Sequence, residues 1–260
     1  MAQVVPGGLK RGVVILCHTL FDFTQAVPYP ILDRSAAAFL SLANALSADG
    51  WVVIQPPFQE DFAYPATFPA SPSYAVQLDI TNDTGNGARY VASTLHWWDH
   101  VVTWIMANYG AWPLVPFGIS WGSWRALQVA INRTSQITAY GVHCPVTILT
   151  HLSSAFTVPA NWTGLTTTGA DVTSSALNGL TSTPGFIGWS TTDIAVGTTD
   201  PPALYNAAHT AGATVTFLTD STNNHGLYAT DIGPGGTGFT GTTIMDWFTG
   251  TVDPLAPKVH

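Results

Sequence analysis

A serine flanked by glycines, in the stretch Gly118-Ile119-Ser120-Trp121-Gly122, lies between two segments whose apolar residues repeat with different periods. The apolar run at 114–117 is typical of a strand, whereas residues 121–132 have helical spacing. A serine on a sharp strand-to-helix turn needs neighbours without side chains. Its hydroxyl then projects at the carboxyl end of a sheet, near a helix N-terminus. The pattern predicts a nucleophile at Ser120; the alternative interpretation is a structural turn in which Ser120 caps the helix.

Two later residues could complete a catalytic triad. Asp193 follows the fifth predicted strand, at 185–189, and His225 follows the sixth, at 214–218. Nucleophile, acid and histidine occur in this chain order when the serine occupies such a strand-to-helix turn. We therefore predict that His225 accepts the proton of Ser120 and later delivers it to the leaving alcohol. Asp193 would fix the tautomer of His225 and stabilise its imidazolium.

Two other carboxylates compete for the role of the acid. Asp200 lies on the same loop as Asp193, seven residues further on and beside two prolines, and it is the rival candidate. Asp220 is so close in sequence to His225 that its side chain would not easily come round to meet the imidazole. We assign the acid to Asp193.

Acyl transfer also needs two backbone N–H donors that stabilise the oxyanion. The residue after the nucleophile, Trp121, would supply one of them. The other would come from the loop that ends the first predicted strand, which contains His18, Thr19, Leu20 and Phe21.

Composition and charge exclude several classes of function. Charged residues make up 8% of the 260 residues, apolar residues make up 46%, and the formal net charge is −8. The chain therefore has ample material for a core, and its acidic balance would repel nucleic acid. Such a composition, with few charged side chains, is commoner in secreted or virion-surface proteins than in cytosolic enzymes. The N-terminus shows no basic segment followed by an apolar one, so we expect no signal peptide.

Other patterns are expected to be structural. The uncharged stretch at 101–124 is broken by Gly110 and two prolines, so a helix followed by a strand explains it better than a membrane span. His96 and His100 have the i, i+4 spacing of metal ligands, but no third ligand is evident, and we expect a helix surface. We therefore predict no metal and no cofactor. Cys17 and Cys144 are expected to be buried thiols.

Strand-like and helix-like segments alternate along the chain, which is typical of a parallel sheet covered by helices on both faces. The strands are expected at 13–16, 51–54, 114–117, 137–142, 185–189 and 214–218, and the helices at 35–46, 88–109, 121–132, 202–211 and 242–248. We expect a single α/β domain over 1–260, with excursions at 56–85 and 145–183 that could form a lid or a substrate wall.

These motifs together resemble the α/β-hydrolase superfamily, in particular its small lipase, esterase and cutinase-like members. The resemblance covers about residues 12–250 and implies a mostly parallel sheet of about six strands. Many bacterial lipases have His-Gly-Leu after the first core strand, and His18-Thr19-Leu20 stands at that place here. The resemblance therefore implies Leu20 as the second oxyanion donor. Because Thr19 replaces the usual glycine, Thr19 and Phe21 are the alternatives.

The expected function is a serine esterase or lipase that acts on hydrophobic carboxylic esters, either small molecules or lipid or polymer esters. Aromatic residues near the motifs would form an apolar substrate wall: Phe21, Phe23, Tyr29, Phe58, Phe62, Tyr64, Phe68, Tyr74 and Trp121. A thioesterase or amidase could use the same triad. A protein of a phage virion or cell surface, whose hydrolase domain mainly binds envelope components, is the alternative from another class. The sequence indicates no oligomeric state.

Overall fold

The computed structural model describes residues 2–4, 11–17, 37–56, 87–147, 177, 179–193, 199–221, 232 and 243–253. Within these residues the chain forms a seven-stranded sheet in the order β1-β3-β2-β4-β5-β6-β7. The strands are β1 (Ala2–Val4), β2 (Gly12–Cys17), β3 (Trp51–Gln55), β4 (Leu114–Ile119), β5 (Tyr140–His143), β6 (Gly185–Ser190) and β7 (Val215–Asp220). Six strands, β2 to β7, are parallel to their neighbours, and β1 pairs antiparallel with β3 at one edge.

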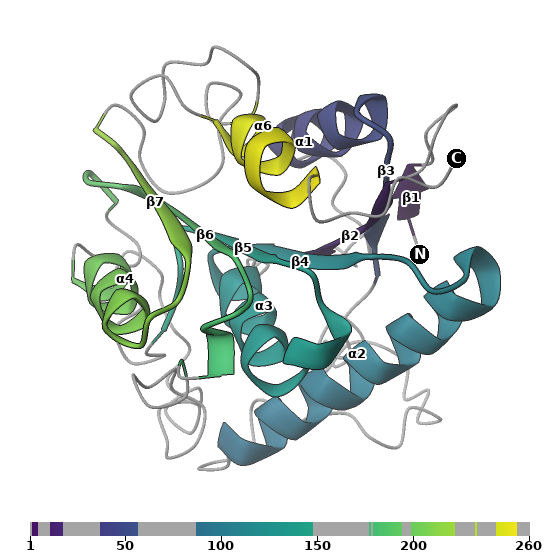
Figure 1. Ribbon diagram of the computed structural model, residues 1–260, viewed down its shortest axis with the longest axis horizontal. Helices are drawn as coiled ribbons and strands as arrows, with labels where there is room; N and C mark the ends of the chain where they lie inside the picture. The colour runs from purple at the N-terminus through teal and green to yellow at the C-terminus, as the bar shows by residue number, and fades with distance from the viewer. Residues whose placement is uncertain are drawn as a thin grey trace, which may run out of the picture.

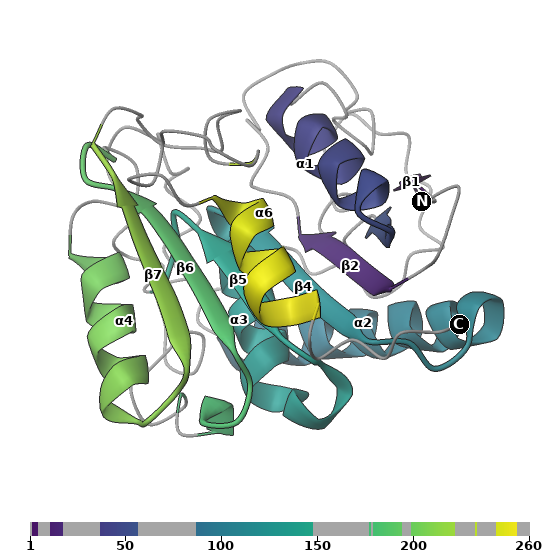
Figure 2. The ribbon, with the colours of Figure 1, turned by 45° about the horizontal axis from the view of Figure 1, so that its top comes forward.

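Helices cover both faces of the sheet. They are α1 (Ala37–Ala48), α2 (Gly87–Tyr109), α3 (Trp121–Asn132), α4 (Asp200–Thr210) and α6 (Ile244–Trp247), which continues into the π-helical turn η6 (Phe248–Val252). Figure 1 shows α1 and α6 on one face and α2, α3 and α4 on the other, and Figure 2 shows the same layers from a tilted direction. The expected parallel sheet with helices on both faces is therefore confirmed.

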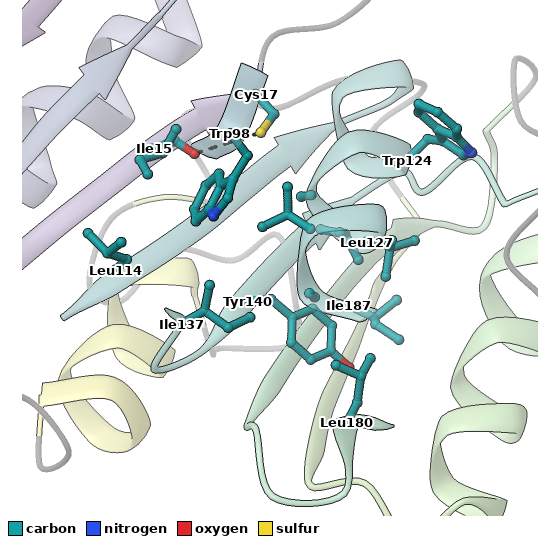
Figure 3. Close-up of a cluster of buried hydrophobic side chains, with 14 of the residues drawn as sticks. Ile15, Cys17, Trp98, Leu114, Trp124, Leu127, Ile137, Tyr140, Leu180 and Ile187 are labelled. Atoms are coloured by element: carbon teal, nitrogen blue, oxygen red, sulfur yellow. Dashed lines mark hydrogen bonds between the residues drawn. The ribbon is translucent and has the colours of Figure 1, made fainter. Parts of the chain in front are cut away.

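The strands read as continuous apolar runs because both faces of the sheet are buried. In β2, for example, Val13 and Ile15 belong to the core on the α2–α3 side, and Val14 and Leu16 belong to the core on the α1–α6 side. Figure 3 shows part of the first core, in which side chains of β2, α2, α3 and β5 gather in one cluster. The cores on both faces fix the carboxyl ends of the strands relative to one another.

A charged cluster joins the C-terminal turn to the amino end of the sheet. Arg11, just before β2, pairs with Asp253 at the end of η6, and it lies 3.4 Å from a carboxylate oxygen of Asp49. The indole N–H of Trp51 donates to Asp253 over 3.2 Å. Burial, and then the nearby Asp49, raises the pKa of the Asp253 carboxyl, an effect that Arg11 opposes.

The elements expected from the sequence are present, with shifts at their ends. Strand β5 begins at Tyr140 rather than 137, because a 3₁₀ turn, η2 (Thr134–Gln136), precedes it. Helix α4 begins at Asp200, so Asp200 is helical rather than a loop residue. The short antiparallel strand β1 was not expected. No helix in the described part of the chain is long and apolar enough to cross a membrane.

Candidate active site

Ser120 lies at the carboxyl end of the central strand β4, in the turn that leads into α3. Its backbone angles are φ 54° and ψ −124°, which residues with a side chain rarely adopt. The backbone N–H of Ser120 donates to the carbonyl of His143 over 2.9 Å and so joins the turn to the end of β5. The side chain of Ser120 makes no capping hydrogen bond to the helix. Ser120 therefore occupies the N-cap position of α3 without a side-chain cap, and its role as a nucleophile stays a prediction.

Gly118 explains why the turn can be so tight. A Cβ atom at this position would lie 2.1 Å from the carbonyl oxygen of Gly122 and 2.6 Å from the backbone nitrogen of Ser123. Both contacts are with backbone, which cannot move aside without opening the turn. The first glycine of the motif is therefore required by the close approach of β4 to the first turn of α3.

Ser123 holds the turn from inside the protein, and the sequence analysis did not identify it. Its backbone N–H donates to the carbonyl of Ser120 over 2.9 Å, and its hydroxyl donates to the same oxygen. The Ser123 hydroxyl also accepts the backbone N–H of Val146 over 2.9 Å. Ser123 is completely buried. A hydroxyl in the otherwise apolar first turn of α3, at residues 121–124, was the signal in the sequence.

Asp193 lies three residues beyond the end of β6 and is 3% exposed. Its backbone N–H donates to the carbonyl of Ser190 over 3.1 Å, and the hydroxyl of Ser190 lies 3.0 Å from that of Thr192. The turn is also tied to β7, because the N–H of Thr191 donates to the carbonyl of Asp220 over 2.7 Å. Ser190 and Asp220 are partners in the β6–β7 register, so the two strands end side by side.

Ser120 and Asp193 thus lie at the same, carboxyl edge of the sheet, with β5 between their strands. His225 follows Asp220 by five residues and lies outside the described residues. The same holds for Leu20 and Phe21, for Thr19, and for the side chain of Trp121, whose backbone begins α3. The other aromatic residues of the expected substrate wall are outside the described part as well.

Asp200, the rival acid, has a hydrogen-bonding environment of its own. The hydroxyl of Thr147 donates to one of its carboxylate oxygens over 3.0 Å, and that of Thr199 donates to the other over 3.4 Å. Asp200 is buried and is the first residue of α4, where a carboxylate interacts favourably with the helix dipole. These contacts connect the start of α4 to the segment after β5.

The two cysteines lie at the carboxyl ends of the strands on either side of β4, and both are buried thiols, as expected. Cys17 ends β2, and burial raises the pKa of its thiol to about 12, although the charge of Arg125 acts in the opposite direction. Cys17 is therefore a thiol at neutral pH rather than a reactive thiolate. Cys144, after β5, is buried too and has a φ of 47°. Arg125 on α3 is 2% exposed, and the sequence analysis did not single out this buried cation.

The histidine pair of α2 is on the surface, as expected. His96 and His100 are exposed, their Nε2 atoms are 3.1 Å apart, and Asp99 between them is paired with Arg133. In the part of the chain that the structure describes, no group of three or more His, Cys, Asp or Glu side chains could hold a metal ion.

Ser120 follows the central strand β4 in a strained conformation, and the buried Asp193 follows β6 of the same parallel sheet. This arrangement indicates the class of structure. It is the α/β-hydrolase fold. No protein-family model and no curated protein sequence matches the chain. Solved structures do match, and three of the most similar represent different hydrolases.

The first is described as a dienelactone hydrolase from Klebsiella pneumoniae, with a TM-score of 0.56 and 16% identity over 86% of this chain and 80% of that one. The second is an acylaminoacyl peptidase from Pyrococcus horikoshii, with a TM-score of 0.57 and 10% identity; 86% of this chain matches 34% of that one. The third is an esterase domain from Rhodothermus marinus, with a TM-score of 0.51 and 15% identity over 87% of this chain and 84% of that one. The chain has the α/β-hydrolase fold.

Proposed function

We propose that this protein is a serine hydrolase that cleaves hydrophobic carboxylic esters, with Ser120 as the nucleophile. The observation that carries the proposal is the conformation of Ser120. A buried, strained serine whose side chain does not cap the adjoining helix is the arrangement that a nucleophile on a strand-to-helix turn requires. The similar structures include an esterase and a protein described as a lactone hydrolase, which supports ester cleavage.

In the proposed reaction the Ser120 oxygen attacks the acyl carbon while His225 takes its proton. The carbonyl oxygen becomes an oxyanion, which the N–H groups of Trp121 and of Leu20 stabilise. When the oxyanion collapses, the bond to the leaving alcohol breaks and His225 returns the proton to that alcohol. Water then attacks the acyl-enzyme by the same steps and releases the acid. Asp193 holds His225 in the productive tautomer throughout.

Asp193 is the proposed acid because of where its strand ends. Strands β6 and β7 finish at the paired residues Ser190 and Asp220. The chain reaches Asp193 three residues after the first of these and His225 five residues after the second. Asp200 lies seven residues beyond Asp193, in the first turn of α4, where its carboxylate accepts from Thr147 and Thr199.

The proposed substrates are neutral esters with short or medium acyl chains. The net charge of −8 would slow the approach of anionic substrates, and no Lys or Arg occurs between Arg34 and Arg89 to bind them. Neutral acyl chains would gain from the burial of apolar surface, at roughly 25 cal/mol per Å². Acyl-CoA or succinyl esters would be poor substrates by the same argument.

The experiment combines covalent labelling with turnover. A fluorophosphonate probe should label wild-type protein at Ser120, as peptide mass spectrometry can establish, and p-nitrophenyl esters of increasing acyl length should be hydrolysed. An amide series and an acyl-CoA series run in parallel test the other bond types. A folded protein that neither reacts with the probe nor hydrolyses any of the three series would refute the proposed function. A preference for thioesters or amides would keep the nucleophile and change the substrate.

A further inference from the structure

The segment after β5, residues 144–147, contacts both sides of the proposed site, and no step of the reaction above uses it. All four of its residues are buried. At its start, the N–H of Cys144 donates to the carbonyl of Gly188 in β6 over 2.8 Å. The segment is therefore fixed to the strand that leads to Asp193.

On one side, this segment holds the nucleophile turn through Ser123. The N–H of Val146 donates to the Ser123 hydroxyl, which donates in turn to the carbonyl of Ser120. The strained angles of Ser120 would relax if nothing opposed them, because such conformations persist only where the surroundings over-determine them. The Ser123 hydroxyl is one of these constraints, and since it is buried, no water would easily replace it.

On the other side, the same segment holds the start of α4 through Thr147. The Thr147 hydroxyl donates to Asp200 over 3.0 Å, and both residues are buried. Asp200 is the first residue of α4, the helix that follows Asp193 along the chain. Hydrogen bonds therefore run from the backbone of Ser120 through residues 144–147 to Gly188 in β6, the strand before Asp193, and to Asp200 at the start of α4, the helix after it.

We propose that Ser123 and Thr147 are positioning residues of the site: through segment 144–147 they hold the Ser120 turn in register with the loop that carries Asp193. This inference rests on the proposed function. Neither residue would touch the substrate. Since a misplacement of about 1 Å can cost roughly 100-fold in rate, the loss of either hydroxyl should lower the rate of the chemical step.

The test compares Ser123→Ala, Thr147→Val and Thr147→Ser with wild type, at a temperature where circular dichroism shows each variant folded. The readouts are kcat and KM for a p-nitrophenyl ester and the rate of fluorophosphonate labelling of Ser120. We expect Ser123→Ala and Thr147→Val to lower kcat and the labelling rate by about 10-fold while KM stays within about twofold. Thr147→Ser keeps the hydroxyl and should restore most of the rate. The double variant should lose less than the product of the single losses, because both act through one segment.

Gln136→Ala is the control for a loss of stability alone. Gln136 accepts the indole N–H of the buried Trp98 over 2.8 Å, at the amino end of β5 and away from the site. This variant should have a lower melting temperature and an unchanged kcat.

The outcomes separate the two proposals. A wild-type protein without labelling or turnover would refute the proposed function and this inference with it. Wild-type rates in both Ser123→Ala and Thr147→Val, or equal losses in Thr147→Ser and Thr147→Val, would overturn the positioning role alone. An equal loss of kcat in Gln136→Ala would do the same. If Ser123→Ala does not fold, the pair of Thr147 variants decides.

Discussion

The turns at the two edges of the sheet differ in the residues that adopt positive φ. At the amino edge, the helices before β3, β4 and β7 are followed by Gly50, Gly110 and Gly212, whose φ values are 98°, 83° and 82°. At the carboxyl edge, Ser120 and Cys144 follow β4 and β5 with φ values of 54° and 47°. Among the described residues, these two are the only ones with side chains that have positive φ.

In the described part of the chain, backbone strain from positive φ is therefore found at the carboxyl edge of the sheet and not at the amino edge. Glycine adopts positive φ without steric cost, so the turns at the amino edge are relaxed. A residue with a side chain in such a conformation costs on the order of 1–3 kcal/mol and must be held by its surroundings. The carboxyl edge retains this cost at Ser120, where the hydrogen bonds of Ser123 and of His143 hold it. Strain that remains where glycine would remove it is typical of a functional site.

The polar groups differ between the edges too. The amino edge has a charged cluster of Arg11, Asp49 and Asp253. The hydrogen bonds that hold the carboxyl edge come from backbone groups and the hydroxyls of Ser123 and Thr147, with Asp200 as an acceptor. Changes at the first edge should therefore act on stability, and changes at the second edge should act on activity.

The largest expected effect concerns Ser120 itself. Ser120→Ala should lower ester hydrolysis on the order of 10³-fold or more and abolish probe labelling, because triad members act as a unit. Ser120→Gly should be equally inactive but about 1 kcal/mol more stable than Ser120→Ala, since glycine relaxes at positive φ. Chemical denaturation of the two inactive variants measures this difference. Near-normal turnover in either variant would contradict the assignment of Ser120 as the nucleophile. Equal stability of the two variants would contradict the strain at its positive φ.

The second prediction separates the two carboxylates that follow β6, Asp193 and Asp200. Asp193→Asn should lower kcat by about 10³- to 10⁴-fold, the range seen when a triad loses its acid. Asp200→Asn should lower kcat only about 10-fold, like Thr147→Val, because it weakens the contacts with Thr147 and Thr199, and it should also lower the melting temperature. Steady-state kinetics and thermal denaturation of both variants test this. The reverse ranking in kcat would transfer the acid role to Asp200.

The third prediction compares a glycine from each edge. Gly118→Ala should destabilise the protein by about 3 kcal/mol or more and eliminate activity, because its methyl group would meet the backbone of Gly122 at 2.1 Å. Gly212→Ala meets nothing within 4 Å and should cost only about 1–2 kcal/mol, from its φ of 82°, with kcat unchanged. Urea unfolding and ester hydrolysis measure both. Equal losses of unfolding free energy in the two variants would contradict this prediction. They would show that the backbone contact at Gly118 destabilises the protein no more than the positive φ at Gly212 does.

The sequence predicts the elements well because both faces of the sheet are apolar and the helices have clear periods. It also indicates Ser120 from its glycines, because a tight turn is a local feature. The antiparallel strand β1 could not be predicted, since its three residues show no pattern and depend on pairing with β3. The roles of Ser123 and Thr147 were hidden for a related reason. Their partners lie 23 and 53 residues away along the chain, and only the fold brings them together.

The smallest expected effect tests whether the charged cluster at the amino edge acts on stability alone. The pKa of Asp253 is raised in the folded protein, first by burial. A group with a raised folded-state pKa contributes stability that is fully present below its unfolded pKa, about 3.9, and is lost as the pH rises through the folded pKa. Relative to Asp253→Asn, wild type should therefore gain unfolding free energy as the pH falls from 7 towards 4.

Asp99 on α2 provides the opposite sign for this last prediction. The hydrogen bond from Arg133 lowers the pKa of the Asp99 carboxyl, so its contribution is present above the unfolded pKa and is lost as the pH falls through the folded one. Relative to Asp99→Asn, wild type should lose unfolding free energy on acidification, by no more than about 1 kcal/mol because the pair is partly exposed to solvent. Urea unfolding of both pairs between about pH 3 and 7 gives the two slopes. Slopes of the same sign would contradict the opposite pKa shifts of Asp253 and Asp99. A change of kcat in Asp253→Asn at neutral pH would contradict the prediction that the charged cluster at the amino edge acts on stability alone.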